Sequence, residues 1–239
     1  MDVLPRFTSV SFAYSSRPKD TKLVQTWPNC GTSKSADQVP TVIHYNPRNR
    51  TKKWGYEVVN ASSGSEDALR WFKLLLQNQS KPTEHYTSSP STPKSRFNSQ
   101  FEELTLYSEG SNTLNSTTFT SPKITPAHDT AKWLRNINKA PVTVVSDFLR
   151  LVREVTEKRI EDACGAAVLR SSKLEYVLTI PAIWSNSAKA QMVEAAEGAG
   201  YGSHRTDFSL IGEPESAAAY VLREITNNLK ASSHFRFHH

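Results

Sequence analysis

Two short apolar runs, each followed directly by a helix-like stretch, constrain the fold of this chain most strongly. The first run, "LEYVLTIP", is rich in β-forming residues and ends at Pro181. The second run, "DFSLIG", is followed by Glu213 and Pro214, and proline suits the first position of a helix. Strands that alternate with helices are typical of an α/β arrangement. The two strand-to-helix turns should then face a cleft at the carboxyl ends of the strands.

Three segments of the C-terminal half have the residue spacing of amphipathic helices. Apolar or small residues recur in them every three or four positions. They are Val145, Phe148, Leu151, Val152 and Val155 in a long helix over about 143–164, Ala188, Met192, Ala195, Ala196 and Ala199 in the next, and Ala218, Val221, Leu222, Ile225 and Leu229 in the last. Gly165 follows the first of these helices, where a C-terminal stop is expected.

The N-terminal part predicts a small antiparallel meander followed by a helix. Alternating apolar residues indicate strands over 7–14, 22–27 and 41–45. Residues 65–77 have helical character, since Ser65 can cap a helix whose shared face holds Leu69, Phe72 and Leu76. A further helix is expected over 127–138.

Residues 80–126 differ in composition from the rest of the chain. In Ser111–Ser121, nine of the eleven residues are Ser, Thr or Asn. Such a stretch buries too little apolar surface to offset the entropy lost on ordering. We therefore expect a long flexible insertion over 80–126.

Composition excludes several classes of protein. The net charge of +6 is spread along the chain and no basic run is interleaved with aromatic residues, so a solvated surface is favoured over nucleic-acid binding. The two cysteines, Cys30 and Cys164, are too few for a disulfide scaffold and form no zinc motif. No stretch has the length of a signal peptide or a membrane span, which predicts a cytoplasmic protein with no membrane partner.

Few residues suggest chemistry by themselves. Glu213 stands between a strand and a helix, where a carboxylate can hold a water or a hydrated cation, although the spacing alone favours a carboxylate that only complements the helix dipole. Lys73 can reach a phosphate or simply extend its ammonium to solvent. Pro181 can stiffen the strand exit or only end the strand. No glycine-rich phosphate-binding motif occurs, and no catalytic triad stands out.

Two motifs of the C-terminal half carry a resemblance to a known family. "LTIPAIWSNSAKAQMVEAAEGAG" followed by "LIGEPESAAAYVL" resembles the paired motifs of the nucleotide-binding domain of the heat shock protein 70 family, in the actin-like ATPase superfamily. The earlier stretches "VPTVIHY", "KKWGYEV" and "ALRWFKLLL" are similar to divergent members common in filamentous fungi. The resemblance covers most of residues 8–230 and implies lobe I of an actin-like (ribonuclease H-like) ATPase that uses ATP and Mg²⁺.

The resemblance also implies roles for four residues. Glu213 matches the glutamate that helps to hold the hydrated magnesium, and Lys73 matches the lysine that contacts the γ-phosphate and the attacking water. Pro181 matches the proline that switches between nucleotide states. Lys189 stands in place of the arginine that partners this proline, and it keeps the charge but loses the planar guanidinium.

Two departures from the family pattern limit the expected activity. The family opens with a "DFGTT" strand and phosphate loop, whereas here "MDVLPRF" precedes "TSVSFAY", so we expect the first strand and its loop to be missing or replaced. The chain reads "NNLKASSHFRFHH" where the family continues to a second phosphate loop. We therefore expect residues 1–239 to be a truncated lobe I that is deficient in hydrolysis, and binding of ATP by it is itself in question.

Two further functions remain open. One is a non-catalytic module that binds a protein partner or client, or a second copy, through the exposed face of the lobe. The other is a complete small α/β enzyme, for which the sequence offers no second catalytic group. Binding of ATP separates the ATPase fragment from the interaction module.

Overall fold

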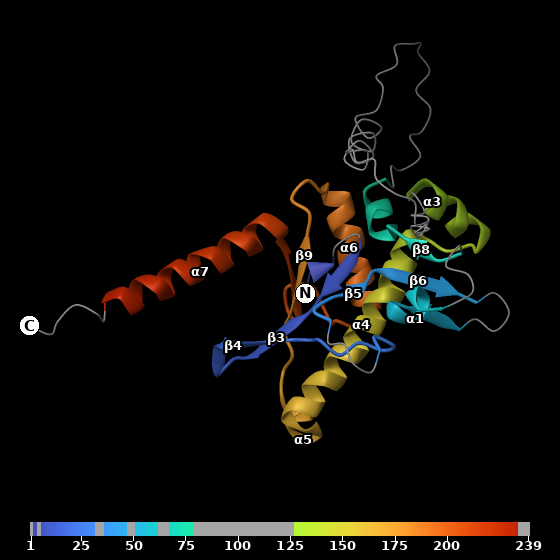
Figure 1. Ribbon diagram of the computed structural model, residues 1–239. Helices are drawn as coiled ribbons and strands as arrows, with labels where there is room; N and C mark the ends of the chain where they lie inside the picture. The colour runs from blue at the N-terminus through green and yellow to red at the C-terminus, as the bar shows by residue number, and fades with distance from the viewer. Residues whose placement is uncertain are drawn as a thin grey trace, which may run out of the picture. The chain divides into compact units, whose positions relative to one another are not determined.

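The computed structural model describes residues 2–3, 6–31, 36–46, 51–61, 67–78 and 127–233 (Figure 1). All of them belong to the compact unit that comprises Met1–Gln79 and Ile124–His239. The expected insertion over 80–126 lies outside the described residues and stays a prediction.

Short strands dominate the first part of this unit and helices the second. The first part contains β1 (Asp2–Val3), β2 (Phe7–Ser9), β3 (Ser11–Tyr14), β4 (Arg17–Leu23), β5 (Val39–Pro40), β6 (Val42–Tyr45), β7 (Lys52–Trp54), α1 (Tyr56–Val59), β8 (Leu69–Arg70) and the 3₁₀ helix η1 (Phe72–Asn78). The second part contains α3 (Ala127–Asn136), α4 (Pro141–Cys164), α5 (Ala166–Ser171), β9 (Tyr176–Ile180), α6 (Asn186–Gly198), β10 (Phe208–Gly212) and α7 (Glu213–Ser233).

The expected strand–helix–strand–helix order is present, and the fold is α/β. Strands β9 and β10 pair in parallel, from Tyr176 opposite Phe208 to Ile180 opposite Gly212. Helix α6 connects them, and its small-residue face is buried at Ala188, Met192, Ala195, Ala196 and Ala199. Because these side chains are small, α6 packs closely against α4. A Cβ added at Gly198 of α6 would lie 3.0 Å from the Ser146 hydroxyl of α4.

Helix α4 forms the centre of the hydrophobic core. It begins at Pro141, two residues before the expected start, because proline fits the first helical position. It ends at the expected place, before Gly165, whose positive φ of 88° favours glycine. Phe148 is fully buried and packs edge-on against Trp54 at a ring distance of 5.8 Å, and against Phe72 at 5.6 Å.

The N-terminal strands do not form one simple meander. The hairpin of β3 and β4 is antiparallel, but the third expected strand, β6, pairs with β7 and β8 instead of continuing from β4. Strand β5 pairs with β2, and β2 pairs with β1. A two-residue strand therefore does precede β2 along the chain, and it lies beside β9.

The expected helix over 65–77 is wrong in its type and extent. Leu69 and Arg70 form strand β8, which pairs with β6, and Phe72–Asn78 form a 3₁₀ helix. Trp71 lies between them with a φ of 61°, in the left-handed region that disfavours bulky residues. The apolar face was identified correctly, since Leu69, Phe72 and Leu76 are all buried.

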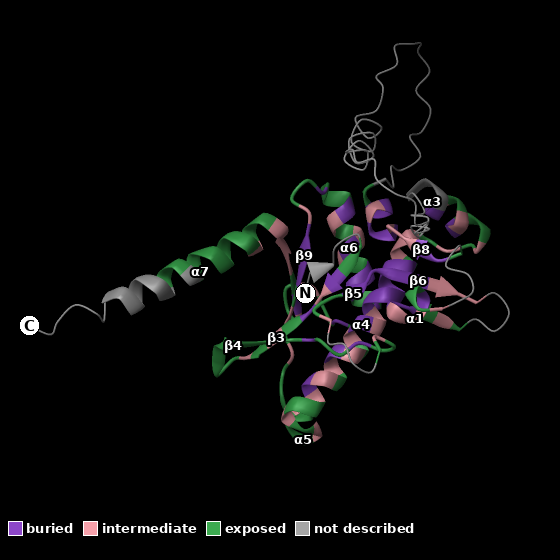
Figure 2. Ribbon diagram, viewed as in Figure 1, coloured by how far each residue is buried: buried purple, intermediate pink, exposed green. Residues whose placement is uncertain are grey.

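Helix α7 differs from the other long helices because its apolar residues are exposed (Figure 2). Val221, Leu222 and Ile225 expose 52%, 64% and 50% of their surface. With the exposed Ala218 they form what we call the α7 stripe. Helix α7 contacts β9 and β10, and its Arg223 donates a hydrogen bond to the Lys19 carbonyl at 3.0 Å.

Candidate functional site

The structure brings Lys73 and Glu213 together although they are far apart in the sequence. Lys73 lies in η1, where its side chain is only 1% exposed. Glu213 is the first residue of α7 and follows the carboxyl end of β10. The Lys73 Nζ lies 4.0 Å from the Glu213 Oε1, a loose ion pair at the expected edge of the parallel strands. We call these two residues the Lys–Glu pair.

The ammonium of Lys73 has further neighbours from β9 and from the turn that follows it. Its Nζ lies 3.5 Å from the carbonyl oxygen of Thr179, the penultimate residue of β9. It also lies 5.3 Å from the ring centre of Trp184, which is 4% exposed. A lysine that is this deeply buried has lost most of its hydration, so these neighbours compensate part of the desolvation.

Glu213 has a carboxylate oxygen that is suited to a further ligand. The side chain is one-third exposed, but its Oε1 is inaccessible and no described residue donates a hydrogen bond to it. Glu215 differs, because its Oε2 accepts a hydrogen bond from the Gly212 backbone at 3.1 Å. Because a water cannot reach an inaccessible oxygen, this Oε1 would hold a water of a hydrated magnesium ion only after the Glu213 side chain turns toward solvent. Among the described residues no cluster of three or more His, Cys, Asp or Glu offers a direct metal site.

Pro181 and Lys189 line a groove of about 850 Å³ beside the carboxyl ends of β9 and β10. The groove also contains Arg205 and Glu215, so charges of both signs face it. The Pro181 carbonyl accepts a hydrogen bond from the Trp184 backbone at 3.2 Å. The Lys–Glu pair is not among the residues that line this groove. Of the four predicted residues, Lys73 and Glu213 therefore lie together, and Pro181 and Lys189 line the same groove.

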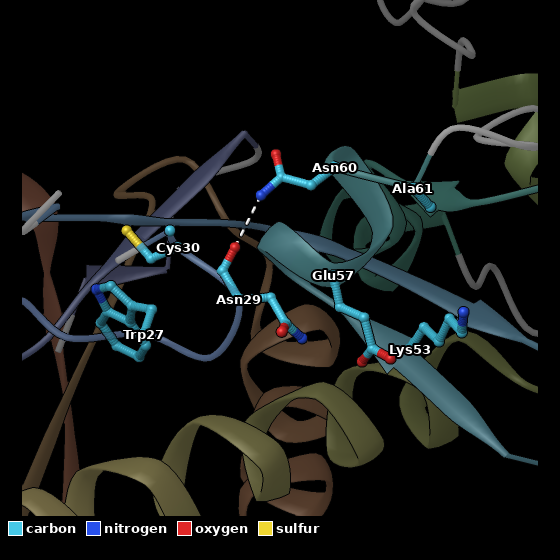
Figure 3. A pocket seen from close by; sticks show the side chains of 8 residues that line it. Trp27, Asn29, Cys30, Lys53, Glu57, Asn60 and Ala61 are labelled. Atoms are coloured by element: carbon cyan, nitrogen blue, oxygen red, sulfur yellow. Dashed lines mark hydrogen bonds between the residues drawn. The ribbon is translucent and has the colours of Figure 1, made fainter. Parts of the chain in front are cut away.

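A second pocket, of about 690 Å³, lies away from these residues (Figure 3). Trp27 and Cys30 flank one side of it, and Lys53 and Glu57 flank the other. The rim is closed by a 2.7 Å hydrogen bond from the Asn60 side chain to the Asn29 carbonyl. None of the predicted site residues lines this pocket, and we assign no role to it.

A cluster around Asp147 joins α4 to the N-terminal strands. Lys52 and Tyr45 donate hydrogen bonds of 2.7 and 2.8 Å to its carboxylate, and Lys139 lies at 3.3 Å. Burial raises the pKa of Asp147, but the hydrogen bonds from Lys52 and Tyr45 and the charges of Lys52 and Lys139 outweigh it and hold this pKa below its ordinary value. Burial, followed by the Asp147 charge, raises the pKa of Tyr45. The cluster is a buried cross-link between elements rather than part of the Lys–Glu pair.

Sequence reasoning did not single out Trp184. The signal was a large aromatic residue in the otherwise polar turn "PAIWSN", one residue before the serine that caps α6. An aromatic residue at such a place is more often exposed or part of the core, so the sequence alone did not reveal its contact with a lysine of another element.

The fold and the site together define a class: an α/β protein with a lysine and a glutamate at the carboxyl ends of two parallel strands. No family model matches the chain. It is similar to a curated protein, heat shock 70 kDa protein 12A of Mus musculus, with 25% identity over 221 residues. The similarity covers 90% of this chain and 27% of the mouse protein, so the chain spans about a quarter of that relative. This similarity supports the resemblance to the heat shock protein 70 family at a coarse level. No helix among the described residues is long and apolar enough to cross a membrane.

Proposed function

We propose that this chain is part of lobe I of an actin-like ATPase of the heat shock protein 70 type, and that it binds Mg·ATP through the Lys–Glu pair. The observation that carries the proposal is the 4.0 Å approach of the Lys73 Nζ and the Glu213 Oε1 at the strand ends. The resemblance assigns these two residues to the phosphate and to the hydrated magnesium. A fold that brings them together from separate elements supports that assignment.

Each residue of the site has a chemical role in this proposal. The Lys73 ammonium supplies positive charge to the terminal phosphate, and the carboxylate of Glu213 accepts a hydrogen bond from a magnesium-bound water. Magnesium, when bound, neutralises phosphate charge. Pro181 and Lys189, which line one groove, connect the strand exit to α6. Lys189 is a point charge without the bidentate fork of an arginine, so it holds the turn less rigidly.

We further propose that the chain by itself hydrolyses ATP very slowly. Catalysis of phosphoryl transfer depends on positioning and on charge stabilisation from several groups around the metal-bound nucleotide. The Lys–Glu pair supplies one cation and one carboxylate to this task. We therefore expect a nucleotide to be held without being enclosed.

Calorimetric titration of the chain with Mg·ATP tests the proposal. We expect saturable binding that Lys73→Met and Glu213→Gln each weaken about tenfold, which corresponds to about 1.4 kcal/mol. The control is Glu194→Gln, which removes an exposed carboxylate from α6 and should bind as the wild type does. Absence of saturable binding, or equal weakening by the control, would contradict the proposal. Release of phosphate, measured in parallel, should stay near the uncatalysed rate.

A second candidate function is self-association, and the exposed α7 stripe favours it. Soluble proteins seldom leave a contiguous apolar helix face uncovered. The partner we propose is a second copy of α7 in antiparallel orientation. Glu213 and Glu215 lie in the first turn of α7, so antiparallel pairing keeps the acidic ends of the two copies apart.

A further inference from the structure

Trp184 occupies a rigid turn between β9 and α6. Its backbone N–H donates to the Pro181 carbonyl at 3.2 Å, which closes a turn directly after the strand. The next residue, Ser185, caps α6, because its hydroxyl accepts a hydrogen bond from the Ala188 N–H at 3.2 Å. The turn and the cap fix the backbone on both sides of Trp184. Its side chain is 4% exposed, so the indole is packed in place as well.

The indole lies against the ammonium of the Lys–Glu pair. The Lys73 Nζ is 5.3 Å from the ring centre, within the range of about 6 Å in which a cation is attracted to an aromatic face. Tryptophan is the strongest aromatic partner for such a contact, and the attraction grows when both groups are removed from water. Both conditions hold here, because Lys73 and Trp184 are 1% and 4% exposed.

Two further contacts of Lys73 are long ones. The Thr179 carbonyl at 3.5 Å is at the long limit of a hydrogen bond, and the Glu213 oxygen at 4.0 Å is at the long limit of an ion pair. A lysine side chain has four rotatable bonds and loses much entropy when its end is fixed. A flat, rigid surface beside the ammonium restricts where that end can lie.

We propose that Trp184 is a positioning residue: its indole face holds the Lys73 ammonium beside Glu213 at the strand ends. The expected effect of Trp184 on ligand binding rests on the proposed function, whereas its contact with Lys73 is present without a ligand. A phenyl ring at this position retains a weaker attraction, whereas an aliphatic side chain retains none. The order tryptophan, phenylalanine, leucine should therefore appear in every property that depends on the position of the ammonium.

The first test uses the protein without nucleotide. In protein labelled with ¹³C-lysine, Lys73→Met identifies the Lys73 ε signal, and the ring current of Trp184 should shift that signal upfield. Trp184→Leu should abolish the shift and Trp184→Phe should retain part of it. The matched control is Trp27→Leu, because Trp27 is similarly buried, at 3% exposure, and no ammonium of the described residues lies over its ring. An unchanged Lys73 signal in Trp184→Leu would overturn the proposal.

A second readout covers the case in which Trp184→Leu does not fold. The protein is labelled with 5-fluorotryptophan, and the ¹⁹F signal of Trp184 is identified as the one that Trp184→Phe removes. In Lys73→Met, which keeps Trp184, this signal should lie at a different chemical shift from that of the wild type. The ¹⁹F signals of Trp27 and Trp133 should not move. An unchanged ¹⁹F chemical shift of Trp184 in Lys73→Met would likewise overturn the proposal.

Titration with Mg·ATP separates this inference from the proposed function. We expect Trp184→Leu to weaken binding about tenfold and Trp184→Phe about threefold, while Trp27→Leu binds as the wild type does. Wild-type protein that shows the ring-current shift but binds no nucleotide would overturn the proposed function and support the contact. Equal nucleotide affinity in wild type and Trp184→Leu would overturn the positioning role.

Discussion

Helices α4 and α7 have similar lengths and similar patterns, yet their apolar faces end in opposite environments. Helix α4 has 24 residues and α7 has 21, and apolar residues recur in both every three or four positions. Val144, Phe148 and Val152 of α4 are fully buried, whereas Val221 and Leu222 of α7 are more than half exposed. The same sequence pattern therefore accompanies two different outcomes.

The difference teaches what an amphipathic pattern can specify. The pattern determines which face of a helix is apolar, but the burial of that face depends on the other elements available to cover it. Helix α4 is covered by α6, η1 and β6. Among the described elements, only β9 and β10 make several contacts with helix α7. The stability of the fold should consequently depend on α4 far more than on the α7 stripe.

Truncation of the central aromatic residue of α4 should have the largest effect. Phe148→Ala removes a fully buried ring that packs against Trp54 and Phe72, so we expect a loss of about 3–5 kcal/mol in the free energy of unfolding. Urea denaturation followed by circular dichroism measures it. The matched variant in α7, Tyr220→Ala, removes a ring that is 65% exposed and should change stability by less than about 0.5 kcal/mol. Similar losses in the two variants would contradict the comparison.

Removal of the buried charge of α4 should have an intermediate effect. Asp147→Asn leaves Lys52 and Lys139 beside a neutral amide, and we expect a loss of about 2 kcal/mol, below the usual 3–5 for buried pairs because both lysines are partly exposed. Urea denaturation at pH 7 measures the loss. Lys158→Met, which removes only exposed ion pairs of the same helix, is the control and should be nearly neutral.

The same carboxylate predicts a pH dependence with a definite sign. The pKa of Asp147 is lower in the folded state than its ordinary value, so the folded protein binds fewer protons than the unfolded chain at acidic pH. Its contribution to stability is therefore complete above the unfolded pKa of about 4 and is lost as the pH falls through the folded pKa. The difference in unfolding free energy between wild type and Asp147→Asn should shrink between pH 6 and pH 3. A difference that grows on acidification would contradict this assignment.

A charge in the α7 stripe should have the smallest effect on stability and a clear effect on association. Leu222→Asp places a carboxylate on a side chain that is 64% exposed, so the free energy of unfolding should change by less than about 0.5 kcal/mol. If two copies pair through α7, sedimentation velocity should show the variant as monomer at concentrations where the wild type is dimeric. Tyr220→Asp, which places the same charge on a 65% exposed residue of α7 outside the stripe, is the control and should sediment as the wild type does. A wild type that sediments as a monomer at high concentration would remove the case for self-association.

Sequence reasoning predicted the C-terminal half well because its elements depend on local patterns. The strand before Pro181, the alanine face of α6 and the helix that begins at Glu213 all appear where expected. Each of these has a local cause, such as a proline, a cap or a run of small residues. Pairing between β9 and β10 followed from the general rule for strands joined by a helix.

The N-terminal half was predicted less well because its pairing is non-local. Leu69 and Arg70 fit a helical pattern with Phe72 and Leu76, but they pair with β6, more than twenty residues earlier in the chain. The tertiary partner outweighed the local periodicity, as is common for short apolar segments.

The sequence singled out Lys73 and Glu213 but did not predict that they lie close together. The resemblance supplied Lys73 and Glu213, and the fold places them within an ion-pair distance of one another. Neither residue carries a local signal that links η1 to the start of α7. The contact with Trp184 was missed for the same reason, because it joins the turn after β9 to a 3₁₀ helix from the other half of the chain.

The left-handed backbone at Trp71 has a mechanical consequence for Lys73. Because β8 is held by β6 and ends at Arg70, a single residue of restricted conformation separates the sheet from η1. We therefore expect a substitution that displaces β8 to change the position of Lys73 as well, because Lys73 follows Trp71 by only two residues. The position of the buried ammonium thus depends on the strand pairing that holds β8 in place.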